Sequence, residues 1–196
     1  MTIGPYYLND SPATPVEVDL ISDEDVTGYN TTVVTLVSPT GHVVPVTAVY
    51  ADETVLFTIP TGSLTEAGVW HVRIKLLGGS SLVTLPSVPF VVQALDGWHN
   101  LDSARSDWEQ APAEDVTLHN LLETARIECE AFAPARATVP ANYRAAQLLQ
   151  ARNSLNAGQV QPSGDFGEGS FQMTPFPLDW KVKQLLRPQT GRPLVG

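Results

Sequence analysis

Cysteine, signal sequences and long apolar runs are scarce or missing in this chain. Cys129 is the single cysteine among 196 residues, so no disulfide can form within the chain and an oxidising compartment is not indicated. The first residues, Met-Thr-Ile-Gly-Pro-Tyr, contain neither a basic start nor an apolar run, and a signal peptide is not expected. No apolar stretch approaches the roughly 20 residues that a membrane span requires. These absences predict a protein without a membrane partner that is assembled in a cytoplasm.

Basic residues are also few. The chain has 11 Lys and Arg against 21 Asp and Glu, which gives a formal net charge of −10. Binding to nucleic acid or anionic lipid depends on clustered Lys and Arg, so this charge opposes general affinity for either. The 43% of apolar residues suffices for a core, and the length fits one large or two small domains.

Motifs that indicate catalysis are missing as well. We find no nucleophile elbow, no paired cysteine and histidine and no metal-ligand spacing, so no enzyme activity, catalytic residue, cofactor or metal is predicted. Cys129 lies on an apolar helical stripe and is interpreted as a buried thiol. The run Asp23-Glu24-Asp25 is interpreted as a solvated loop, with a weak calcium site as the alternative. The glycine-rich loop 161–170 lacks a lysine and is not a phosphate cradle.

The first half of the sequence has a period of two. From Trp70 to Leu76, apolar residues alternate with His71, Arg73 and Lys75, which is typical of a half-buried antiparallel strand. Short strands separated by regular turns predict a β-sandwich over residues 1–95. The segment from Leu64 to Trp70 resembles the corner and strand entry of immunoglobulin-like domains. The expected strands are 15–21, 31–38, 42–50, 53–59, 68–77 and 81–93.

The second half, residues 96–196, changes to a helical period. A short helix is expected over 101–110. A second helix carries an apolar stripe from Leu118 to Phe132, with Thr117 or Asp115 as its cap and Pro134 at its end. A third helix begins at Pro140 and runs to about residue 158. The fold class is therefore α+β with two domains, a β-sandwich followed by a small helical bundle and an extended C-terminal arm.

The third and fourth helices have apolar residues in more than one direction. In the third, Tyr143 and Leu149 lie off the main apolar side, which Arg144 and Arg152 border, so this helix is expected to contact more than one neighbour. In the fourth helix, expected over 178–187, Trp180 lies about 200° from Leu178. If the aliphatic residues of this helix pack on the domain, Trp180 is free to contact a partner. The aliphatic residues in question are Leu178, Val182, Leu185 and Leu186.

Three segments of the C-terminal half together resemble the head-to-tail connector (adaptor) proteins of long-tailed bacteriophages. They are Asp115-Val-Thr-Leu-His-Asn-Leu-Leu122, the run from Val139 to Arg152 (Val-Pro-Ala-Asn-Tyr-Arg-Ala-Ala-Gln-Leu-Leu-Gln-Ala-Arg), and the stretch from Gly167 that ends in Pro175-Phe-Pro-Leu-Asp-Trp-Lys-Val-Lys-Gln-Leu-Leu-Arg-Pro188. The resemblance covers about half of the chain. The β-sandwich is a departure from the minimal helical adaptor.

The resemblance implies a virion protein of the head–tail neck that forms a twelvefold ring beneath the portal. Such a ring extends the DNA channel, lets genomic DNA pass without specific binding, and supports the next neck or tail-completion protein. For subunit contacts it points to Tyr143, Arg144, Leu149 and Arg152. For docking on the portal protein it points to Phe176, Leu178, Trp180, Lys181, Lys183, Leu185, Leu186, Arg187 and Arg192.

A second hypothesis is a binding module on the virion surface, tail or baseplate. In this case the β-sandwich recognises a host glycan or another virion protein, and the helical half only anchors it. Exposed aromatic side chains on the sandwich would favour the glycan.

Overall fold

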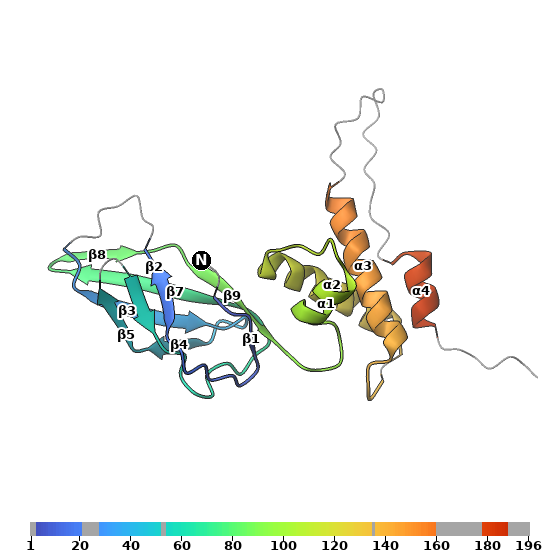
Figure 1. The fold of residues 1–196 in the computed structure, drawn as a ribbon, viewed down its shortest axis with the longest axis horizontal. Helices are drawn as coiled ribbons and strands as arrows, with labels where there is room; N and C mark the ends of the chain where they lie inside the picture. The colour runs from blue at the N-terminus through green and yellow to red at the C-terminus, as the bar shows by residue number, and fades with distance from the viewer. Residues whose placement is uncertain (1–2, 21–27, 52–53, 135, 160–177, 188–196) are drawn as a thin grey trace, which may run out of the picture. The chain divides into compact units, whose positions relative to one another are not determined.

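In a computed structural model the chain divides into two compact units, residues 1–94 and 95–196 (Figure 1). The structure describes residues 3–20, 28–51, 54–134, 136–159 and 178–187. In the described residues the first unit is made of strands and the second of four helices, so the predicted α+β class is confirmed. We call them the sheet unit and the helical unit. The division falls within a residue of the expected boundary.

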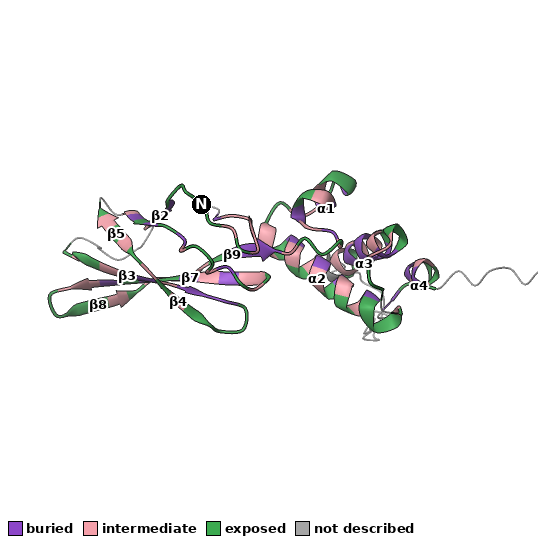
Figure 2. Cartoon of the chain, turned by 90° about the horizontal axis from the view of Figure 1, so that it is seen from below, coloured by how far each residue is buried: buried purple, intermediate pink, exposed green. Residues whose placement is uncertain are grey.

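The sheet unit contains two sheets that share one core. The large sheet has the order β1(Tyr6–Tyr7)-β9(Val88–Gln93)-β7(Gly68–Gly78)-β3(Thr31–Val37)-β4(Val43–Val46), with β8(Ser81–Thr84) also paired to β7. The small sheet has the order β2(Val16–Asp19)-β6(Thr54–Phe57)-β5(Ala48–Ala51). The buried residues of both sheets form a common hydrophobic core, as the predicted period of two requires. Figure 2 marks buried residues in purple.

Two of the expected strands are each divided in two. Residues 42–50 form β4 and β5, which belong to different sheets and are joined through Thr47. Residues 81–93 form β8 and β9, which both pair with β7 and are separated around Pro86. Proline has no N–H to donate to the ladder, so pairing is interrupted there. The two-residue strand β1, parallel to β9, was not expected.

The entry to β7 explains the Gly68-Val69-Trp70 segment. Trp70 is fully buried, and its indole Nε1 donates to the carbonyl of Glu66 at 2.8 Å. Gly68 has φ +134°, and a Cβ at this position would lie 2.7 Å from Cγ of Pro39. Only glycine fits this backbone without strain, so the turn that places Trp70 in the core depends on it.

The helical unit contains α1(Leu101–Asp107), α2(Asp115–Phe132), α3(Ala141–Gln159) and α4(Trp180–Leu186). α1 is shorter than expected because Trp108 leaves the helical conformation as its C-cap. The N-cap of α2 is Glu114, whose carboxylate accepts from the Thr117 amide; Asp115 and Thr117, the predicted caps, lie inside the first turn. α3 lies between α2 and α4 and packs against both (Figure 1).

Candidate partner-binding surface

Helix α4 is fixed by one side and open on the other. Leu178, Val182 and Leu186 are buried against Cys129, Tyr143 and Ala146, in a cluster that joins α4 to α3 and α2. Trp180 points the opposite way and is 62% exposed. The aliphatic residues of this helix thus meet the condition set in the sequence analysis, since they pack on the domain on the side away from Trp180, with Leu185 only partly buried.

Trp180 lines an open groove with a volume of about 650 Å³. Leu149 of α3 and Leu185 of α4 supply further apolar surface, and the side chain of Asn142 donates to the carbonyl of Leu185, which ties the two helices together. Lys181, Gln184 and Arg187 complete the lining, and all three are exposed. We call this surface the Trp180 groove.

The Trp180 groove lies in the most basic part of an acidic chain. From residue 178 onward the sequence has one acid, Asp179, and four bases, Lys181, Lys183, Arg187 and Arg192. An exposed tryptophan beside apolar surface and flanked by cations is the composition of an interface centre, where Trp and Arg are enriched. Phe176 and Arg192, two of the predicted portal-docking residues, lie outside the described residues.

Tyr143 is not part of an open surface, which corrects the expectation that it faces a neighbouring copy. It is 6% exposed, its hydroxyl donates to the carbonyl of Pro134 at 3.2 Å, and its ring lies 6.3 Å from that of Trp98. Tyr143 lies on the side of α3 that packs against α4, and its ring contacts the buried residues of that helix.

The two-sided character of α3 has a cause inside the chain. The helix packs on α2 with one side and on α4 with another, so its apolar residues are largely used within the unit. Ala141 and Ala145 are exposed, whereas Ala146, Gln147 and Ala151 are buried. Of the predicted subunit-contact residues, Leu149 remains partly accessible in the Trp180 groove.

Arg152 is engaged within its own unit. Its guanidinium donates to the carbonyl of Asp107 at 2.7 Å and lies 5.5 Å from the ring centroid of Trp108. The Nε atoms of Arg152 and Arg144 are buried and have no hydrogen-bond partner among the described residues. Neither arginine forms an ion pair in the described part of the chain.

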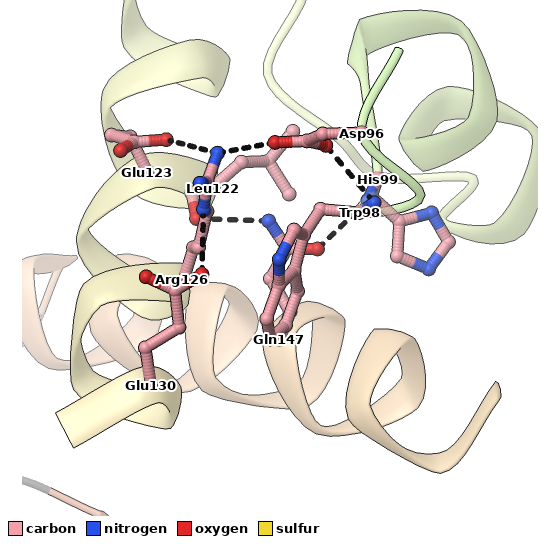
Figure 3. A network of polar contacts seen from close by, with 8 residues as sticks. All are labelled: Asp96, Trp98, His99, Leu122, Glu123, Arg126, Glu130 and Gln147. Atoms are coloured by element: carbon pink, nitrogen blue, oxygen red, sulfur yellow. Dashed lines mark hydrogen bonds and ion pairs between the residues drawn. The ribbon is translucent and has the colours of Figure 1, made fainter. Parts of the chain in front are cut away.

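Two polar networks connect the first residues of the helical unit to α2 and α3 (Figure 3). Gln147 is 1% exposed; its amide oxygen accepts from the His99 amide at 2.9 Å, and its Nε2 donates to the carbonyl of Leu122 at 3.0 Å. Arg126 forms ion pairs with Asp96 at 2.6 Å, Glu130 at 3.1 Å and Glu123 at 3.8 Å. These contacts join the start of the unit to α2 and α3.

Gln147 was not among the residues predicted to matter for this surface. Its signal was a glutamine among Ala145, Ala146, Leu148 and Leu149, at a position that faces the apolar stripe of α2. A buried amide there requires partners for its hydrogen-bonding groups, and these are the backbone atoms it joins.

Burial favours the neutral forms of Cys129 and His99. Burial, with smaller contributions from Glu128 and Glu130, raises the pKa of Cys129 to about 12, so the thiol stays protonated at neutral pH, as expected for a buried thiol. Burial, followed by the charge of Arg144, lowers the pKa of His99, and Asp107 opposes the shift.

Among the described residues no group of three or more His, Cys, Asp or Glu is placed to hold a metal ion. None of the helices in the described ranges has the length and apolar character needed to cross a membrane. Asp23-Glu24-Asp25 and the glycine-rich loop 161–170 lie outside the described residues. A comparison of the chain with protein-family models and with curated proteins found no match in either.

Proposed function

We propose that this chain is a structural protein of a bacteriophage virion, a head-to-tail connector that assembles as a ring beneath the portal. The ring would extend the DNA channel and support the next neck or tail protein. The observation that carries the proposal is the Trp180 groove, an apolar surface with cationic borders on a helix that its own unit anchors from the other side.

The groove has the features of a docking site for a protein. Trp180 is 62% exposed and lies on an anchored helix. A partner can therefore contact this large side chain without the loss of conformational entropy that ordering a loose segment would cost. Lys181 and Arg187 favour a partner that presents carboxylates. In our proposal this partner is the portal protein.

The remaining parts of the chain are compatible with the channel role. The net charge of −10 disfavours adhesion of the passing DNA. Arg144 and Arg152 are in our proposal the subunit-contact residues, since each carries a half-buried charge with no carboxylate partner in the described chain. We also propose that the sheet unit is immunoglobulin-like, supported by its two sheets on one core and by the buried Trp70.

The test is the affinity of the full chain for the portal protein of the same virion, measured by calorimetry. Truncation before Pro175 is not a clean experiment, because it would remove the buried side chains of Leu178, Val182 and Leu186. Trp180→Ala leaves these in place and is expected to weaken binding by about 2 kcal/mol or more, roughly 30-fold.

Ile127→Ala is the matched control. Ile127 is 57% exposed on α2, and its replacement should leave the affinity unchanged. Wild-type affinity in the Trp180→Ala variant would remove the Trp180 groove from the interface, and absence of portal binding by the unmodified chain would remove the connector role.

The alternative role is a module that recognises a host glycan, and exposed aromatic side chains on the sandwich would favour it. In the described residues of the sheet unit every Phe, Tyr and Trp side chain is buried or partly buried, so none presents a mostly exposed ring on which a sugar could stack. A glycan array with the full chain would overturn this argument if it returned a specific ligand.

A further inference from the structure

The two outward faces of the sheet unit carry opposite charges. Arg73 and Lys75 point outward from β7 of the large sheet, and they are the only basic residues in positions 1–94, which include nine acidic residues. Glu17 and Asp19 point outward from β2 of the small sheet. All four are exposed, and none forms an ion pair in the described part of the chain.

The two charge pairs have the same spacing. In each pair the residues are separated by one position on a single strand, so their Cα atoms lie about 7 Å apart along that strand. Two acids on one face thus match two bases on the other in sign and in separation. Such a match gives orientation and register to a contact between proteins.

Exposed apolar side chains accompany the charges on both faces. On the large sheet, Val33 lies directly opposite Lys75 in the β3–β7 ladder and is 46% exposed. On the small sheet, Leu56 lies opposite both Glu17 and Val49, and these two apolar residues are 38% and 60% exposed. Each face therefore presents a charge with an apolar neighbour one strand away.

The small-sheet face is also hollowed. A groove of about 690 Å³ runs beside Val49 and Leu56 and is lined by apolar and hydroxyl-bearing residues without a single charge, including Pro12, Thr47, Thr58 and Pro60. An uncharged hollow next to two acids accepts an apolar side chain and leaves the ion pairs at its border.

We propose that the sheet units of two copies of this chain stack front to back, with the large-sheet face of one copy on the small-sheet face of the next. Arg73 and Lys75 then lie over Glu17 and Asp19 of the second copy, and Val33 enters the surface formed by Leu56 and Val49. The partner is a second copy because each sheet unit carries both the basic face and the acidic face that complements it. Two copies that met through like faces would instead place equal charges together.

The contact uses different surfaces of the two copies, so each copy retains one free face. Contacts of this type propagate into a closed ring or an open filament. The stacking involves only the sheet unit and a second copy, so it stands or falls separately from the role proposed for the Trp180 groove.

The experiment is sedimentation velocity of the full chain over a concentration series, with paired charge reversals. Arg73→Glu with Lys75→Glu makes both faces acidic, and Glu17→Lys with Asp19→Lys makes both basic. Each double variant is expected to weaken self-association at least about tenfold. Added salt should weaken the association of the unmodified chain, since the four charges are exposed.

Mixing the two double variants is the decisive step. The acidic large-sheet face of the first matches the basic small-sheet face of the second, and the remaining faces match as in the unmodified chain, so association should return in the mixture alone. Arg136→Glu with Ser106→Glu and Asn120→Glu, three exposed positions of the helical unit, gives the same change in net charge as the Arg73 and Lys75 reversal; this variant is the control and should associate normally. Circular dichroism verifies that every variant is folded.

A chain that remains a single copy at its highest soluble concentration would overturn the proposal. So would association that persists in either double variant, or a mixture that stays dissociated while both variants are folded.

Discussion

Replacement of Gln147 tests how the helical unit is held together. Its side chain is 1% exposed and spans two backbone groups, the His99 amide at 2.9 Å and the Leu122 carbonyl at 3.0 Å. The substitution Gln147→Leu keeps nearly the same volume and removes both hydrogen bonds. It therefore separates the hydrogen bonds from the packing of the side chain.

The expected decrease in the free energy of unfolding depends on which hydrogen bonds the two backbone groups keep after the substitution. The Leu122 carbonyl still accepts the hydrogen bond of its own helix, so its loss is small. The buried His99 amide loses its partner, and an unsatisfied buried donor costs about 1–3 kcal/mol. We expect Gln147→Leu to lower the free energy of unfolding by about 1–3 kcal/mol, and Gln147→Ala by about 1 kcal/mol more, because a cavity is added.

The assay is urea unfolding followed by tryptophan fluorescence. Trp98, Trp108 and Trp180 report on the helical unit, whereas Trp70 belongs to the sheet unit. Gln184→Ala, at an exposed position of α4, is the control and should change stability by less than about 0.5 kcal/mol. If Gln147→Leu is as stable as the unmodified chain, the two hydrogen bonds do not hold the helical unit together and this reasoning is refuted.

Two further predictions concern protonation. Since burial raises the pKa of Cys129 to about 12, iodoacetamide at pH 8 should modify the thiol only after unfolding; alkylation of the native chain at the rate of a free thiol would contradict this. The pKa of His99 is lower in the folded state than its ordinary value of about 6.5, so the unfolded state binds more protons as the pH falls through that value. The free energy of unfolding should therefore decrease below about pH 6.5, and His99→Asn should flatten the pH profile in urea titrations; an equally steep profile would exclude His99, leaving His119, whose pKa burial also lowers, as the source.

The sequence predicted correctly those strands and helices in which the spacing of apolar residues determines which side is buried. The alternation from Trp70 to Leu76 placed β7 correctly, because a strand with one buried face has only one register that hides its apolar residues. The same argument placed Trp180 outside and Val182 inside, since helical geometry puts them on opposite sides.

What the sequence did not predict depends on contacts between distant segments. No local pattern distinguishes β4 from β5, because Val43–Val46 and Ala48–Ala51 are both apolar runs and only the core decides which sheet each joins. Tyr143 was misplaced for a related reason. An apolar side of α3 that faces a neighbour looks the same in sequence whether that neighbour is α4 or another copy.

The distribution of charge in the sheet unit has an electrical consequence. Two cations on one face and two anions on the other, across two layers about 10 Å apart, create a dipole through the thickness of the unit. Because positions 1–94 have a formal charge of −7, an approaching polyanion is repelled overall, yet the torque on this dipole turns the side with Arg73 and Lys75 toward it. The field of such a neighbour would thus select an orientation of the unit before any side chain touched it.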